Sequence, residues 1–141
     1  MFIVSMLAAG LVAAVLVLLA GVHGYWACGG AWPARTPAEL GPMVVGTRPG
    51  AAMPGPLACV LVIGALATGA GLVAWAGLGG GWLARLGSAG VGVVLGLRGL
   101  LGFVDGRVRP ATRGQPFYAL NRRIYSPLCL LLAALIGVVL M

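Results

Sequence analysis

Charge is the property that this sequence lacks most. Only 8% of its 141 residues are charged, whereas a soluble domain carries about a quarter. Lysine is absent, and the only carboxylates in the chain are Glu39 and Asp105. So little polar surface cannot cover a water-soluble globule of this length. The sequence therefore predicts a single domain, residues 1–141, that is embedded in a membrane.

Histidine and cysteine are also scarce, and their scarcity excludes several kinds of site. A lone histidine, His23, cannot form a multi-histidine metal site within one chain, so we expect no metal and leave any cofactor unknown. The three cysteines, Cys28, Cys59 and Cys129, form no C-x-x-C pair. In a cytoplasmic setting they are reduced thiols, whereas outside the cell a Cys28–Cys59 bridge becomes feasible.

Long apolar runs are what the sequence has in abundance. Hydrophobic residues make up 61% of the chain, and the apolar runs approach the roughly 20 residues that cross a bilayer. We predict an all-α, four-helix transmembrane bundle with spans at about 2–22, 57–78, 82–104 and 126–141. Ser126 and Pro127 resemble an N-cap and first helical position, which makes the last span short, at about 22 Å.

Two longer loops, residues 29–55 and 105–125, fall on one side of this predicted bundle. Seven of the nine arginines lie in them, and Arg85 alone lies on the other side. Because arginine concentrates in short cytoplasmic loops, we expect these loops in the cytoplasm and both termini outside. The first loop, where Thr36 and Glu39 fit a short capped helical turn, serves as a surface connection or a lid.

The third span carries a stripe of small residues along one face. At 100° per residue the stripe falls within about 120° of the helix, and it comprises Ser88, Gly92, Gly96, Gly99, Gly102 and Gly106. Small residues let two helix backbones approach closely in a membrane. We expect Gly92, Gly96 and Gly99 to pack inside the bundle, with an oligomer contact as the alternative.

A few polar and aromatic residues cluster at the loop side of the spans. Arg98 lies within the third apolar run, and Asp105 follows two turns later on the same face. His23, Trp26 and Tyr125 map to the same membrane side. We expect these five residues to converge, with Asp105 as the charge partner of Arg98. The cluster is either a structural polar anchor or an anion or proton site.

Several runs resemble a bacterial family of four-helix membrane proteins of unknown function. They are His23-Gly24-Tyr25-Trp26-Ala27-Cys28-Gly29-Gly30, then Leu97-Arg98-Gly99 through Asp105-Gly106, and Phe117-Tyr118-Ala119-Leu120-Asn121-Arg122-Arg123-Ile124-Tyr125-Ser126-Pro127-Leu128-Cys129. The resemblance covers essentially the whole chain, and Tyr125–Cys129 is its most specific part. It implies the four-helix architecture and a bacterial plasma-membrane location, and it implies no reaction. Asp is common in the family where this chain has Asn121.

Our leading hypothesis is a non-enzymatic accessory protein, or a bundle that binds lipid or a small ligand at the face of the two loops. The alternative is a membrane-embedded enzyme that uses His23, Arg98, Asp105 and Tyr125, although one histidine and two carboxylates supply few acid–base roles. Expected partners are membrane lipids, a second copy of the chain or a larger membrane complex. Nucleic acid is not expected despite the net charge of +7, because no soluble basic domain remains outside the spans.

Overall fold

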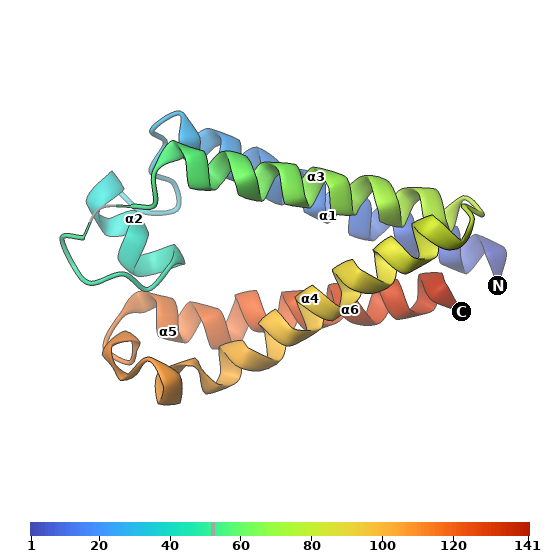
Figure 1. Cartoon of the computed structure of the whole chain (residues 1–141). Coiled ribbons are helices and arrows are strands. Elements are labelled where there is room, and N and C mark those ends of the chain that lie inside the picture. The colour runs from blue at the N-terminus through green and yellow to red at the C-terminus, as the bar shows by residue number, and fades with distance from the viewer. Residues whose placement is uncertain (52) are drawn as a thin grey trace.

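Figure 1 shows the computed structural model, which describes residues 1–51 and 53–141. Its long helices are α1 (Phe2–Ala27), α3 (Pro56–Gly77), α4 (Trp82–Val108) and the run Pro116–Leu140. That run joins α5 (Pro116–Leu120), the π-helical turn η2 (Asn121–Tyr125) and α6 (Ser126–Leu140). Two short elements complete the chain: α2 (Pro37–Val44) and the 3₁₀ turn η1 (Pro110–Thr112). The four long helices are apolar enough to cross a membrane, which confirms the predicted fold class.

The long helices are arranged as two pairs, with α1 beside α3 and α4 beside α6 (Figure 1). The pairs converge at the end that holds both termini, where one core of Val12, Leu16, Val73, Leu132 and Ile136 joins them. The ribbons diverge toward the other end, where α2 and α5 lie. The shared apolar core thus joins the two helix pairs away from the loop end.

A tight glycine turn connects α3 to α4. Gly79 has a φ of +86°, a conformation that side chains disfavour. The Gly80 amide donates to the carbonyl of Trp75 at 2.8 Å, and a Cβ on Gly80 would lie 2.6 Å from that oxygen. Trp75 and Trp82 flank the turn with exposed side chains, as expected where a helix leaves the hydrocarbon core.

The last long helix differs from its prediction. The chain is already helical from Pro116, and Tyr125 has helical angles of −67° and −46°, so Ser126 is not an N-cap. The Ser126 amide instead bonds the Asn121 carbonyl, five residues back. Pro127 has no amide proton and would crowd the preceding turn, and a π turn at this place relieves both problems. The helix is therefore longer than the predicted 126–141 span.

The small-residue stripe of α4 faces the last long helix. A Cβ on Gly92 would lie 3.2 Å from Ile136, and one on Gly96 would lie 3.8 Å from the Cβ of Ala133. At Gly99 a Cβ would come within 2.7 Å of Leu130 and 3.0 Å of the Ser126 carbonyl. The fit is thus tightest near the loop end, where the α4 backbone approaches its neighbour most closely.

Candidate functional site

The site at the loop end is a cavity of about 380 Å³, which we call the Arg98 cavity. Charged side chains on α4 and just beyond it line one part, namely Arg98, Asp105 and Arg109. Apolar side chains line the rest, namely Val44, Val45, Leu101 and Phe117. The cavity therefore lies between α4, α5 and the end of α2, and it presents both charge and hydrocarbon to an occupant.

A buried amide holds the guanidinium of Arg98. Arg98 Nη2 donates to Asn121 Oδ1 at 3.0 Å, and Asn121 Nδ2 donates to the carbonyl of Gly102 at 3.1 Å. The Ser126 hydroxyl donates to the same Asn121 oxygen at 3.3 Å. Asn121 and Ser126 are 1% and 0% exposed, respectively, so their part of the network is shielded from competing solvent. Gly102 makes room for it, since a Cβ there would overlap the Ser126 hydroxyl at 1.8 Å.

Asp105 pairs with a different arginine from the one predicted. Its Oδ1 accepts from Arg109 Nε at 2.8 Å and from Arg109 Nη2 at 2.5 Å. Its Oδ2 lies 2.9 Å from the Thr112 hydroxyl, whose single proton is shared in turn with the Arg109 carbonyl at 2.8 Å. The predicted Arg98–Asp105 pair is therefore replaced by two separate contacts, Arg98 to Asn121 and Asp105 to Arg109. Both arginines still face the same cavity.

The first loop reaches the Arg98 cavity through the residues that follow α2. Arg109 Nη1 donates to the Val45 carbonyl at 3.4 Å, and its guanidinium lies 5.4 Å from the ring centroid of Phe117. Gly46 has a φ of +76°, and a Cβ on it would lie 2.7 Å from the Phe117 ring. Leu40 on α2 is only 2% exposed. Through these contacts the segment that follows α2 packs against Arg109 and Phe117 at the edge of the Arg98 cavity.

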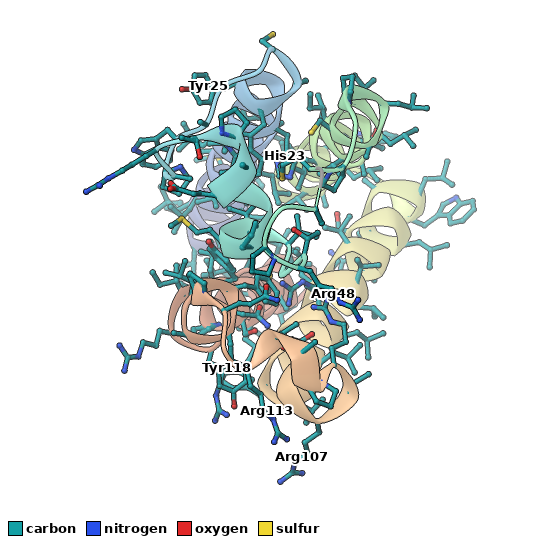
Figure 2. The ribbon with its side chains drawn as sticks, turned by 90° about the vertical axis from the view of Figure 1, so that its left-hand side faces the viewer. His23, Tyr25, Arg48, Arg107, Arg113 and Tyr118 are labelled. Carbon is teal, nitrogen blue, oxygen red and sulfur yellow. The ribbon has the colours of Figure 1, made fainter. Side chains whose placement is uncertain are left out.

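His23 and Trp26 line a second, smaller cavity of about 180 Å³ between the ends of α1 and α3. His23 Nδ1 lies 2.7 Å from the Leu19 carbonyl, and its ring centroid is 4.9 Å from that of Trp26. Val45 lines both cavities. Figure 2, which views the molecule from the loop end, shows His23 near the top of the view and Arg107 and Arg113 near the bottom.

Tyr125 lies beside the Arg98 cavity without joining its polar network. Its ring centroid is 6.3 Å from that of Phe117, which lines the cavity. Within residues 1–51 and 53–141, the Tyr125 hydroxyl has no hydrogen-bond partner. The five residues predicted to converge are thus divided: Arg98 and Asp105 in one cavity with Tyr125 next to it, and His23 and Trp26 in the neighbouring one.

Sequence reasoning did not identify the polar partners Asn121, Ser126, Arg109 and Thr112. Asn121 and Ser126 are five residues apart, which on a regular α-helix separates them by about 140°. The π turn, with its bonds between residues five apart, brings them onto one face. Arg109 was detectable, because it follows Asp105 by four residues, the spacing of a favourable helical ion pair.

The described residues include no cluster of three or more histidine, cysteine, aspartate or glutamate side chains that could hold a metal ion. What the Arg98 cavity offers instead is a guanidinium with apolar walls. Arginine presents a planar fork of N–H donors that matches the oxygens of a carboxylate or a phosphate. The arrangement is suited to binding an anion that carries an apolar portion.

Comparison with protein-family models identifies the family of the chain. A family model described as "Protein of unknown function (DUF3995)" matches residues 16–136, from within α1 to within α6, which includes α3, α4 and both loops. No curated protein and no solved structure matches the chain.

Proposed function

We propose that this chain, which belongs to the DUF3995 family of proteins of unknown function, is a non-enzymatic membrane protein that binds an amphipathic lipid or small ligand in the Arg98 cavity. One observation carries the proposal: the loop end of the bundle contains a cavity with charged side chains, including the Arg98 guanidinium, on one part of its wall and hydrocarbon on the rest. Its volume of about 380 Å³ falls in the 300–1,000 Å³ range typical of ligand pockets.

The exposure of its walls supports access from the side of the bundle. Leu101 is 60% exposed, and Arg98 on the same helix is exposed as well. In a membrane-crossing helix such residues face lipid or a cavity rather than packed protein. A lipid-like molecule therefore has a lateral route to the guanidinium.

The enzyme alternative has less support from the same residues. An acid–base mechanism needs proton-transferring groups within hydrogen-bond reach of one reacting centre. His23 and Asp105 line different cavities, and both oxygens of Asp105 already accept hydrogen bonds. Ligand binding uses the residues as they stand, since it needs only the cation and its apolar surroundings.

The proposed setting is a bacterial plasma membrane in which the loops face the cytoplasm and the termini lie outside. The support for it is the excess of arginine in the loops. Membrane lipids are the proposed partners, and a second copy of the chain or a larger membrane complex stays a prediction.

Filling the cavity tests the proposed function. We expect Leu101→Trp to weaken the binding of two short amphiphiles, dioctanoylglycerol and dioctanoylphosphatidylglycerol, by about tenfold or more, because the indole occupies their space. The matched control is Leu100→Trp, since Leu100 is 59% exposed on the same helix and does not line the cavity. Binding is measured as the ligand-dependent rise in melting temperature in a nonionic detergent. Equal binding by the two variants, or no binding by the wild type, contradicts the proposed function.

A further inference from the structure

The charges around the Arg98 cavity do not cancel. Arg109 and Asp105 neutralise each other through their two hydrogen bonds. Arg98 is held by Asn121, a neutral amide, and so keeps its full positive charge. Among the described residues, Arg98 Nη1 and Nε have no hydrogen-bond partner. One net positive charge and a set of fixed N–H donors therefore face the cavity.

The position of Arg98 along α4 puts the level of lipid phosphates within reach of its side chain. With 27 residues, α4 is about 40 Å long, whereas the hydrocarbon core is about 30 Å thick. If the exposed Trp82 marks one boundary of the core, Arg98 lies about 24 Å along the helix, roughly 6 Å short of the opposite boundary. An arginine side chain can snorkel over that distance. Its guanidinium thus reaches the layer where phosphodiesters sit.

The remaining walls suit the part of a lipid that adjoins its phosphate. The apolar part of the cavity wall comes from Val44, Val45, Leu101 and Phe117. Leu101 is also open to the outside of the bundle. A glycerol backbone with the first carbons of its acyl chains would cover these side chains. A free inorganic anion would leave them exposed to water, so a lipid fits this wall better than a soluble anion does.

Resting on the proposed function, we infer that the ligand of the Arg98 cavity is the phosphodiester head group of a glycerophospholipid. The Arg98 guanidinium binds the phosphate oxygens through the donors that Asn121 does not use. Asn121 is a positioning residue: its buried amide orients the guanidinium, and because it is neutral, it leaves the arginine charge available to the phosphate.

Two variants isolate the charge from the shape of the site. Arg98→Gln removes the cation, and Asn121→Asp places a carboxylate where the amide oxygen now lies, 3.0 Å from the guanidinium. We expect each variant to weaken dioctanoylphosphatidylglycerol binding by about tenfold or more and to change dioctanoylglycerol binding less than twofold. Asn121→Asp is nearly isosteric and gains an ion pair with Arg98, but it loses the Nδ2 donor to the Gly102 carbonyl, so the two effects on its melting temperature without lipid oppose each other. The comparison of the two amphiphiles within each variant keeps the test independent of that change.

The matched control is Arg107→Gln, which removes the same charge from the same helix. Arg107 is exposed and, within the described part of the chain, has no hydrogen-bond or ion-pair partner. Its substitution should leave the affinity for dioctanoylphosphatidylglycerol within twofold of wild type. A loss equal to that of Arg98→Gln would show general attraction by net charge and would overturn the inference.

The choice of probe separates a lipid from a soluble anion. Inorganic phosphate and glycerol phosphate, each at 10 mM, should not displace the lipid. If either anion displaces the lipid with an affinity equal to that of the lipid, the ligand is a soluble anion and the inference is overturned. Equal wild-type affinity for dioctanoylglycerol and dioctanoylphosphatidylglycerol would overturn the role of the phosphate while leaving the proposed function intact. Binding of neither amphiphile would overturn both.

Discussion

Gly102 is the position on α4 where the structure allows no side chain at all. In a Gly102→Ala variant, the new Cβ would lie 1.8 Å from the Ser126 hydroxyl and about 3 Å from the Arg98 and Asn121 polar atoms. The hydroxyl would have to leave its place, which breaks its bond to Asn121 and costs about 0.5–1.5 kcal/mol. Overpacking of a close contact costs a further 1–3 kcal/mol or so.

Alanine also favours a helix interior over glycine by about 1 kcal/mol, which partly offsets these losses. The expected net effect of Gly102→Ala is a destabilisation of about 0.5–3.5 kcal/mol. Gly96→Ala is the matched control, because its Cβ would meet the Cβ of Ala133 at an ordinary 3.8 Å. That variant should be as stable as the wild type or about 1 kcal/mol more stable.

The assay is equilibrium unfolding of the two variants and the wild type in mixed micelles of a nonionic detergent and sodium dodecyl sulfate. If Gly102→Ala proves as stable as Gly96→Ala, α4 does not approach the last helix as closely as the structure indicates. The hydrogen bonds of Asn121 to Arg98, Gly102 and Ser126 would then be wrong as well, since they depend on that approach.

Two further predictions concern the loop end. Cys28 is exposed there, so a membrane-impermeant maleimide should label it in permeabilised cells and not in intact cells, with Cys28→Ser as the blank. Labelling in intact cells refutes the cytoplasmic placement. Asp105→Ala should lower the free energy of unfolding by about 1–3 kcal/mol, because Arg109 and the buried Thr112 hydroxyl lose their shared acceptor. The control Arg107→Ala should change the free energy of unfolding by less than about 0.5 kcal/mol. Equal losses of unfolding free energy for the two variants in chemical denaturation would contradict the role assigned to Asp105.

The fold could be predicted from the sequence largely because apolar length is a strong signal. Three spans begin within one residue of their predicted starts, at Phe2, Pro56 and Trp82. For the fourth, α6 begins at Ser126 as predicted, but Ser126 is not the N-cap that the Ser126-Pro127 pair suggests, because the helical run already begins at Pro116. A local motif was overridden by the π turn before it, and sequence periodicity does not reveal such a turn.

The site was predictable in its location but not in its pairings. Arg98 and Asp105 share a face, yet seven residues place them about 10 Å apart along the helix. Arg109, one turn beyond Asp105, is the closer partner and forms the ion pair. The amide that holds Arg98 comes from a different helix, so only the tertiary structure brings the two together. The same holds for the separation of His23 from Arg98, since it depends on how the two helix pairs diverge.

Dipolar recoupling between phosphorus and nitrogen in the solid-state NMR spectrum tests the central claim most directly. Protein labelled with nitrogen-15 in its arginine side chains is reconstituted into bilayers that contain phosphatidylglycerol. A phosphate hydrogen-bonded to Arg98 lies about 4 Å from a guanidinium nitrogen, given a charge-assisted bond of 2.7–2.9 Å. We predict a short phosphorus–nitrogen contact that disappears in Arg98→Gln and persists in Arg107→Gln. A spectrum in which the Arg98→Gln substitution removes no short contact would contradict the account.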